Sequence, residues 1–233
     1  MSDTVLNFNN IGKKFGYQWA VRSATGEWKQ GDYVSLFGKN GAGKSTLLYL
    51  ISGVYRPHEG SISFSNGFDK RKFNRCMQLM SHQSMFYHRM SARDNLFFFE
   101  SLYDTKVTRS EVDTALDFAG LLKAARKTID GFSRGMLQRL MIARVILARP
   151  SILFLDEPFT GLDIQGQNLL IQILENRGLS IFNWKIDSYL FVDHDLERAY
   201  RYCDKIWLIE NGKLLMKETK DKISLKEIEG KMS

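Results

Sequence analysis

The chain has 233 residues, of which 44% are hydrophobic and 12% aromatic, and it carries a formal net charge of +7. That length and apolar content suffice for a full core in one domain with an inserted subdomain. There is no apolar run of about 18 residues and no signal-peptide pattern at the first residues, so we expect neither a transmembrane helix nor secretion. Cys76 and Cys203 lack metal-ligand or redox spacing and fit a reducing cytosol.

The first part of the chain alternates short apolar segments with turns. Segments 5–8 and 61–64, flanked by glycine-containing turns, predict a small antiparallel sheet. Between them, the apolar run 33–37 predicts a buried strand, and residues 45–51 predict a helix that ends at Gly53. We therefore expect a strand, a connecting loop and a helix within a β-rich region.

The connecting loop fits the pattern G-x-x-x-x-G-K-[ST] without a gap. Its glycines let backbone N–H groups turn inward around phosphate oxygens, its lysine neutralises the outer phosphates, and its serine hydroxyl can hold Mg²⁺. This P-loop, or Walker A motif, predicts nucleotide binding. Its residues are Gly38, Lys39, Asn40, Gly41, Ala42, Gly43, Lys44, Ser45 and Thr46.

The middle of the chain has the pattern of helices. Segments beginning at Ser91 and Thr108 carry helix-start signatures of the capping-box type. Ser133 resembles the N-cap of an apolar helix over 136–148 that Pro150 terminates, and the amino end of such a helix attracts phosphate. Taken alone, that stretch also fits an ordinary capped helix. These features predict a helical subdomain over about 85–148.

Two carboxylates follow the next apolar run, 152–155. Asp156 and Glu157 stand at the carboxyl end of this expected parallel strand, the edge at which ligands sit in α/β sheets. There Asp156 can hold Mg²⁺ through water, and Glu157 can polarise the attacking water. The alternative is a simple strand-end turn before Pro158, which the P-loop upstream makes the weaker interpretation.

The end of the chain predicts a hairpin and a charged tail. Residues 206–215 resemble two strands joined by an Asn211-Gly212 turn. Beyond them, lysines alternate with acids, which favours a solvated face over a surface for nucleic acid or anionic membrane.

The stretch 132–139 resembles the Leu-Ser-Gly-Gly-Gln signature of ATP-binding-cassette (ABC) ATPases. Ser133, Gly135, Gln138 and Arg139 fit the extended pattern, whereas the residues at 132, 134 and 136 depart from it.

Further family elements follow in order over residues 15–194. By resemblance, Phe15 stacks on adenine, Gln83 is the Q-loop glutamine that contacts Mg²⁺ and relays the nucleotide state, and 160–163 is the D-loop. His194 matches the switch histidine that contacts the γ-phosphate.

The resemblance implies an α/β fold: a P-loop NTPase (RecA-like) core with a small antiparallel β subdomain and the inserted α-helical subdomain, all within one nucleotide-binding domain over 1–233. It also implies that the chain binds ATP and Mg²⁺. The catalytic residues would be Glu157, His194 and Gln83, and the metal residues Ser45, Gln83 and Asp156. Nucleotide would contact the P-loop, Phe15, Ser133, Gly135 and Asp163.

The family resemblance implies a motor subunit of a transporter. Importer motors usually carry a longer carboxyl-terminal regulatory domain, whereas only a short tail follows Leu215, so we expect an exporter. In this family the signature of one copy completes the ATP site of another, so a second copy or a related subunit is expected, together with separate permease subunits. The chain would lie peripherally at the cytoplasmic side of the inner (plasma) membrane. The segment 85–90 is where the family docks its membrane partner, although it and Phe97–Phe99 could instead fill the subdomain core.

Finer features resemble the ATPase of the haem exporter used in cytochrome c maturation and its export-type relatives. They are segments 15–21, 81–83, 91–96 and 133–136. The alternative from another class is a soluble ABC ATPase that acts on nucleic acid or ribosomes, but such chains usually hold two cassettes or a long coiled coil. A non-hydrolytic regulatory cassette fits less well, since Lys44, Asp156, Glu157 and His194 occur together.

Overall fold

The computed structural model describes residues 4–65, 67–81, 85–103 and 106–232, and separates two compact units. The first unit comprises Met1–Leu79, Ile152–Glu157 and Asp187–Ser233, and the second comprises Met80–Ser151 and Pro158–Ile186. None of the helices in these described ranges has the length and apolar character of a membrane-spanning segment.

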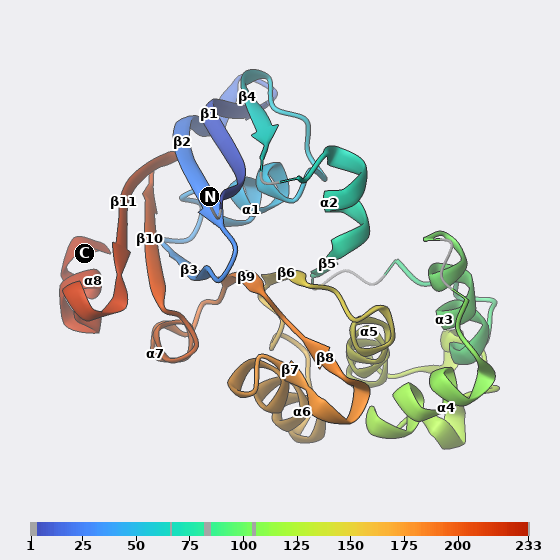
Figure 1. Ribbon diagram of the computed structural model, residues 1–233. Helices are drawn as coiled ribbons and strands as arrows, with labels where there is room; N and C mark the ends of the chain where they lie inside the picture. Colours follow the sequence, from blue (N-terminus) through green and yellow to red (C-terminus); the bar gives the residue numbers. More distant parts are fainter. Residues whose placement is uncertain (1–3, 66, 82–84, 104–105, 233) are drawn as a thin grey trace. The chain divides into compact units, whose positions relative to one another are not determined.

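The first unit contains both main sheets (Figure 1). Its elements are β1 (Thr4–Phe15), β2 (Gln18–Lys29), β3 (Tyr33–Phe37), α1 (Lys44–Ile51), β4 (Glu59–Phe64), α2 (Lys70–Cys76), β5 (Met77–Met80, ending at the unit boundary), β6 (Ile152–Asp156), β9 (Ser188–Val192), α7 (Leu196–Arg201), β10 (Lys205–Glu210), β11 (Lys213–Thr219) and α8 (Leu225–Met232).

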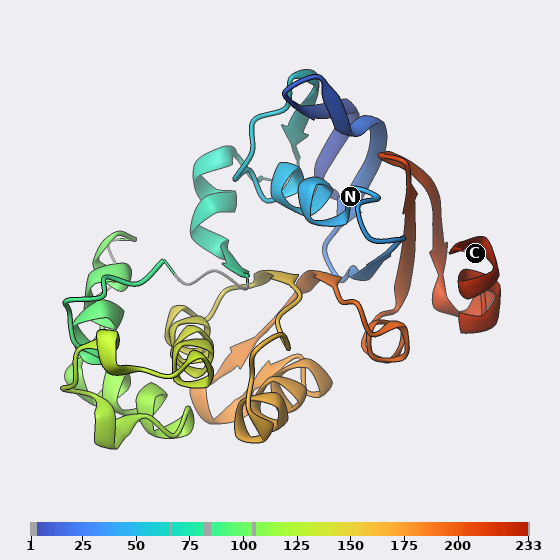
Figure 2. The same ribbon diagram turned by 180° about the vertical axis from the view of Figure 1, so that it is seen from behind.

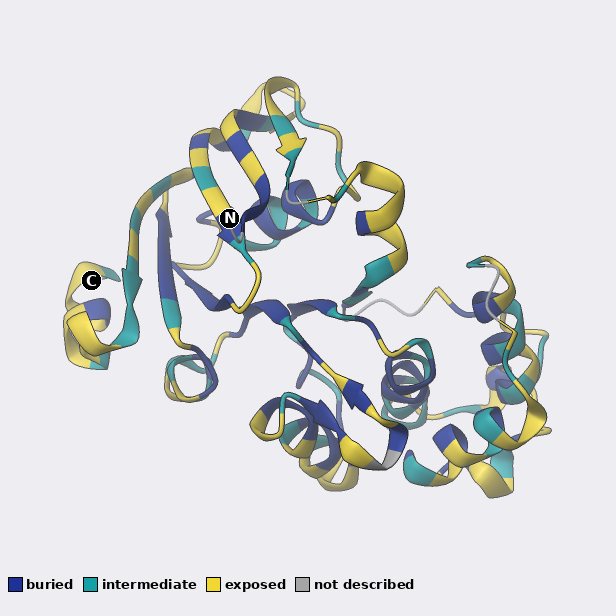
Figure 3. Ribbon diagram, viewed as in Figure 1, coloured by how far each residue is buried: buried dark blue, intermediate teal, exposed yellow. Residues whose placement is uncertain are grey.

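The larger sheet has the strand order β11-β10-β3-β9-β6-β5. Strands β10, β3, β9 and β6 run parallel to one another, and β11 pairs antiparallel with β10. Every residue of β3, β6 and β9 is buried (Figure 3), as expected for parallel strands covered on both faces. The predicted strands at 33–37 and 152–155 are thereby confirmed.

The smaller sheet is antiparallel, in the order β2-β1-β4, which confirms that prediction. Helix α1 packs on β1 and β2 of this sheet and on β6 and β9 of the larger one. The two sheets meet around apolar residues such as Trp28 and Phe154, whose ring centroids lie 4.8 Å apart in an edge-on arrangement. The P-loop helix therefore starts from a rigid, buried support.

The second unit is mainly helical (Figure 2). Side-chain caps begin its helices as predicted: Ser91 accepts from the N–H of Asp94, Ser133 accepts from that of Met136, and Thr108 forms a full capping box. Its elements are α3 (Ala92–Ser101), α4 (Arg109–Phe118), α5 (Arg134–Ala148), α6 (Ile164–Glu175), β7 (Gly178–Leu179) and β8 (Trp184–Lys185), with short 3₁₀ turns at Leu122–Ala124, Ile129–Gly131 and Ser180–Phe182.

The predicted carboxyl-terminal hairpin is present as β10 and β11. Asn211 and Gly212 both have positive φ, at 47° and 76°, which is the backbone that a two-residue type I′ turn requires. Past β11, a 3₁₀ turn (Lys220–Lys222) leads into α8.

Candidate functional site

The P-loop joins β3 to α1 in the first unit and lines a cavity of about 360 Å³. No side chain caps the amino end of α1, so the positive end of the helix faces this cavity with backbone donors. A cavity of this kind binds phosphate. It is lined by Ala20, Asn40, Gly41, Gly43, Lys44, Ser45, Thr46 and Glu157.

Gly43 shows why the loop needs glycine. It has a φ of 106°, and a Cβ placed on it would lie 2.3 Å from the carbonyl oxygen of Ala20. Any other residue would be strained in that conformation and would also push the loop away from β2. The tight loop therefore depends on a close backbone contact that the motif alone does not reveal.

Lys44 is held by the loop itself. Its Nζ donates to the carbonyl oxygens of Gly38, at 2.8 Å, and Lys39, at 3.0 Å. Burial lowers the pKa of the Lys44 ammonium, and the carboxylates of Glu157 and Asp156 oppose that shift. The Lys44 ammonium is thus fixed beside the cavity. An outer phosphate bound there would supply a negative charge to pair with it.

The two predicted metal residues of the first unit are in contact. The Ser45 Oγ donates to Oδ1 of Asp156 at 2.7 Å, across 111 residues of sequence. Asp156 is buried at the end of β6, and its Oδ2 accepts a second hydrogen bond, also 2.7 Å, from the Tyr49 hydroxyl. The sequence motif includes Ser45 but ends before Tyr49, so sequence reasoning missed this third residue.

These groups fit a magnesium ion, because Mg²⁺ prefers oxygen ligands and usually binds proteins through one or two side chains plus phosphate and water. Among the residues described, no three or more His, Cys, Asp or Glu side chains form a metal cluster of their own. Magnesium bound here would be held by Ser45 and Asp156 and would neutralise charge on the transferred phosphate.

Glu157 follows Asp156 with an unusual backbone. Its φ is 48°, in the left-handed region that residues other than glycine seldom adopt, and its N–H donates to the carbonyl of Val192 at 2.8 Å. Such strain tends to occur at functional sites, where neighbouring structure maintains it. The conformation places Glu157 at the wall of the P-loop cavity.

His194 lies just past β9, also in the first unit, beside a strongly held carboxylate. The Nδ1 atom of His194 is 3.5 Å from Asp193, which is itself buried and bound by Arg198 through two hydrogen bonds of 2.6 and 2.8 Å. This pairing raises the pKa of Arg198. The loop that carries His194 is therefore anchored, while the imidazole remains largely exposed and able to reach a ligand.

Phe15 lies at the end of β1 and is 50% exposed, so its ring can stack on a base. Tyr55 packs edge-on against it at 5.7 Å between centroids. Gln83 lies outside the described residues, and its predicted metal and relay roles stay predictions.

The signature residues belong to the second unit. Ser133 accepts a 3.2 Å hydrogen bond from Met136 N–H, which leaves its own hydroxyl proton able to donate. Gly135 lies against the carboxylate of Asp163, which caps α6, and Arg139 is 3.3 Å from that same carboxylate. The structure thus brings the predicted residues Ser133, Gly135 and Asp163 together at the amino ends of α5 and α6.

The predicted docking segment divides into a buried and an exposed part. Phe86 is only 5% exposed and packs edge-on against Phe99, so it belongs to the core of the second unit. Met85 and Tyr87 are 68% and 51% exposed, and Tyr87 contacts Phe98. The expectation of an accessible surface thus applies to Met85 and Tyr87, and Phe86 has to be removed from it.

A buried acid lies nearby on α3. Glu100 is 2% exposed, and desolvation raises its pKa to about 7 despite the charges of Arg144 and Arg149. Its Oε1 has no hydrogen-bond partner among the described residues. Arg144 stacks on Phe99, with 3.9 Å from the guanidinium carbon to the ring centroid.

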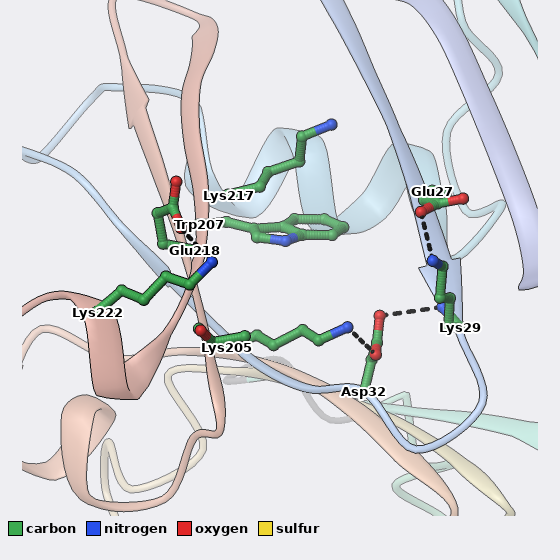
Figure 4. Close-up of a pocket in the computed structure, with 9 residues that line it drawn as sticks. Glu27, Lys29, Asp32, Lys205, Trp207, Lys217, Glu218 and Lys222 are labelled. Carbon is green, nitrogen blue, oxygen red and sulfur yellow. Dashed lines mark hydrogen bonds and ion pairs between the residues drawn. The ribbon is translucent and has the colours of Figure 1, made fainter.

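A second cavity of the first unit, of about 280 Å³, is rich in lysine but differs from the P-loop cavity (Figure 4). Three of its four lysines pair with carboxylates, and the fourth, Lys217, donates to a backbone carbonyl and so joins β11 to β2. The pairs are Lys29 with Glu27, Lys205 with Asp32, Lys222 with Glu218, and Lys217 with the carbonyl of Thr25.

Comparisons with known proteins show the family of this chain. Residues 21–160 match the family described as ABC transporter. The ABC transporter ATP-binding protein NatA of Bacillus subtilis is 31% identical over 205 residues, which cover 84% of this chain and 80% of that protein. The bacitracin transport ATP-binding protein BcrA of Bacillus licheniformis is 33% identical over 223 residues, covering 91% and 69%.

Solved structures share the fold. An ATP-binding subunit of an ABC transporter superimposes with a TM-score of 0.81 at 25% identity, covering 98% of this chain and 99% of that one. A dimeric ATP-binding cassette bound to ADP and phosphate gives a TM-score of 0.76 at 23% identity, with 92% and 98% covered. The predicted P-loop NTPase fold is confirmed. The chain therefore belongs to the ABC transporter family, as an ATP-binding subunit with ATPase activity.

Proposed function

We propose that the chain is the motor of an exporter, peripheral at the cytoplasmic side of the membrane, and drives substrate movement through separate membrane subunits. The observation that carries the proposal is that one chain holds a single P-loop with Asp156 and Glu157 in one compact unit, and a single signature helix in the other. A complete site then requires a second copy or a related subunit, whose signature faces this P-loop.

The roles that we propose for the residues are supported by their positions. Lys44 and the backbone donors of the P-loop hold the phosphates, Glu157 orients the attacking water, and His194 contacts the γ-phosphate. Ser133 and Gly135 act on the nucleotide of the neighbour, and Phe15 stacks on adenine. Closure on ATP and release after hydrolysis make a two-state switch that a membrane partner can use.

Export as the direction is supported by one relative that carries it in its name, whereas two spermidine/putrescine relatives from Mycoplasma, 29% identical, carry import in theirs. The Nod factor export ATP-binding protein I of Burkholderia orbicola is 31% identical over 221 residues, covering 91% of this chain and 70% of that protein. The finer resemblance to the haem exporter of cytochrome c maturation remains a prediction of the subfamily.

The coupling surface of this proposal is formed by Met85 and Tyr87. Both side chains are exposed and apolar in large part, and the Tyr87 ring packs edge-on against Phe98, as suits the anchor residues of a protein interface. We expect a membrane subunit to contact them, because this segment follows the predicted Q-loop residue directly.

The test is co-purification of a membrane protein with this chain from native membranes. Tyr87→Asp should reduce recovery of that partner about tenfold or more, since a charge in an interface core is poorly tolerated, while ATP affinity stays within about twofold. Leu215→Asp, on an exposed leucine of the first unit, is the matched control and should leave recovery unchanged. Equal recovery for both variants contradicts the docking surface, and retained nucleic acid without a membrane partner favours the soluble alternative.

A further inference from the structure

Tyr49 gives the carboxylate of Asp156 a second hydroxyl donor. Ser45 donates to Oδ1 and Tyr49 donates to Oδ2, both at 2.7 Å. The two donors stand four residues apart on α1, which places them on one face of the helix. Each oxygen of this buried carboxylate therefore has its own donor from the P-loop helix.

The two donors differ in what else they do. Ser45 is the residue that the P-loop pattern assigns to the metal, whereas position 49 lies beyond the pattern. Hydrogen bonds to an ionised carboxylate are roughly twice as strong as neutral ones, so a phenol at this distance fixes the orientation of the group. Tyr49 can keep Asp156 in place whatever Ser45 binds.

Tyr49 is itself positioned by its neighbours. Its carbonyl accepts the N–H of Tyr55 at 2.9 Å, and the two rings meet edge-on with centroids 5.2 Å apart. The Tyr55 ring in turn packs against Phe15. These contacts already restrict the Tyr49 ring, so little further side-chain entropy is lost when its hydroxyl donates to Asp156.

We propose that Tyr49 is a positioning residue for magnesium in this ATP site: its hydroxyl orients Asp156 so that the carboxylate is ready to bind the metal. This inference rests on the proposed metal roles of Ser45 and Asp156. Groups that orient metal ligands typically change metal affinity by about 10–100-fold when they are removed.

The experiment compares Tyr49→Phe with the parent full-length chain. Binding of a fluorescent ATP analogue is measured in EDTA and across a Mg²⁺ titration, and the Mn²⁺ complex is examined by electron paramagnetic resonance. Tyr49→Phe should need about tenfold more Mg²⁺ for half-maximal enhancement of binding and should change the Mn²⁺ spectrum. Nucleotide affinity in EDTA should stay within about twofold of the parent value, which also reports that the variant is folded.

Tyr55→Phe is the matched control, since it removes a neighbouring hydroxyl and keeps the ring contact, and it should leave the Mg²⁺ titration unchanged. An unchanged titration and Mn²⁺ spectrum for Tyr49→Phe overturn the positioning role. Asp156→Asn separates the two hypotheses: if it too has no effect on the Mg²⁺ titration, then the metal site itself is assigned wrongly.

Discussion

The side chain of Arg134 lies directly over Gly161. A Cβ placed on Gly161 would be 2.5 Å from Nε of Arg134 and 3.1 Å from its Cδ, and Gly161 has a φ of 83°. Arg134 is the residue that departs from glycine in the signature, and Gly161 belongs to the predicted D-loop. Within the second unit, the signature helix and the D-loop are therefore packed together by a contact that depends on both residues.

The first prediction is that Gly161→Ala destabilises the chain by about 1–2 kcal/mol, from its positive φ and from the clash with Arg134. In the Arg134→Ala background the clash is absent, so the same substitution should be milder by about 0.5–1 kcal/mol. Urea unfolding of the four proteins in this cycle measures the coupling. Strict additivity would mean that Arg134 does not rest on Gly161 in solution.

The second prediction concerns the hydrogen-bond donors of the signature. Ser133→Ala should lower ATP turnover of the assembled transporter about tenfold or more, because it removes a hydroxyl donor and the cap of α5. Arg134→Gly keeps the cap and the backbone donors, so its turnover should fall only about threefold or less. ATPase rates measured in the intact complex show which of the two variants loses more turnover. Near-parental turnover for Ser133→Ala would remove this signature from the reaction.

The third prediction concerns pH and Glu100. Its pKa is about 7 in the folded chain and 4.5 as the ordinary value, so the folded state holds the extra proton between these pH values. Stability of the parent should therefore fall as pH rises from about 4.5 to 7, whereas Glu100→Gln lacks this dependence. Over this pH rise, the unfolding free energy of the parent should fall relative to that of Glu100→Gln by up to about 3 kcal/mol. Urea unfolding of both proteins at pH 5 and pH 8 checks this prediction. The same difference in unfolding free energy at both pH values would refute it.

Local patterns predicted most elements of the fold. The strand at 33–37, the P-loop helix and the caps at Ser91, Thr108 and Ser133 depend on neighbouring residues, and the structure confirms them. The helix of the signature begins at Arg134, two residues earlier than expected, because the cap satisfies donors in the first turn.

What sequence reasoning missed depends on contacts between distant residues. Tyr49 meets Asp156 across 107 positions, and no local pattern reports that pairing. The positive φ of Glu157 could not be predicted from the sequence either. Glutamate has no preference for the left-handed conformation, and only the surrounding strands impose it. For Phe86, an aromatic in a polar segment gave no signal of whether it faces solvent or the core.

Glu157→Gln tests whether Glu157 activates water in an ATP site that two cassettes share. The substitution keeps the size of the side chain and the phosphate-binding loop but removes the charged group that orients water. We expect ATP binding within about threefold of the parent, turnover of the assembled complex reduced at least about 100-fold, and an ATP-bound dimer trapped on gel filtration. Turnover at the parental rate would contradict the assignment of Glu157 as the catalytic base.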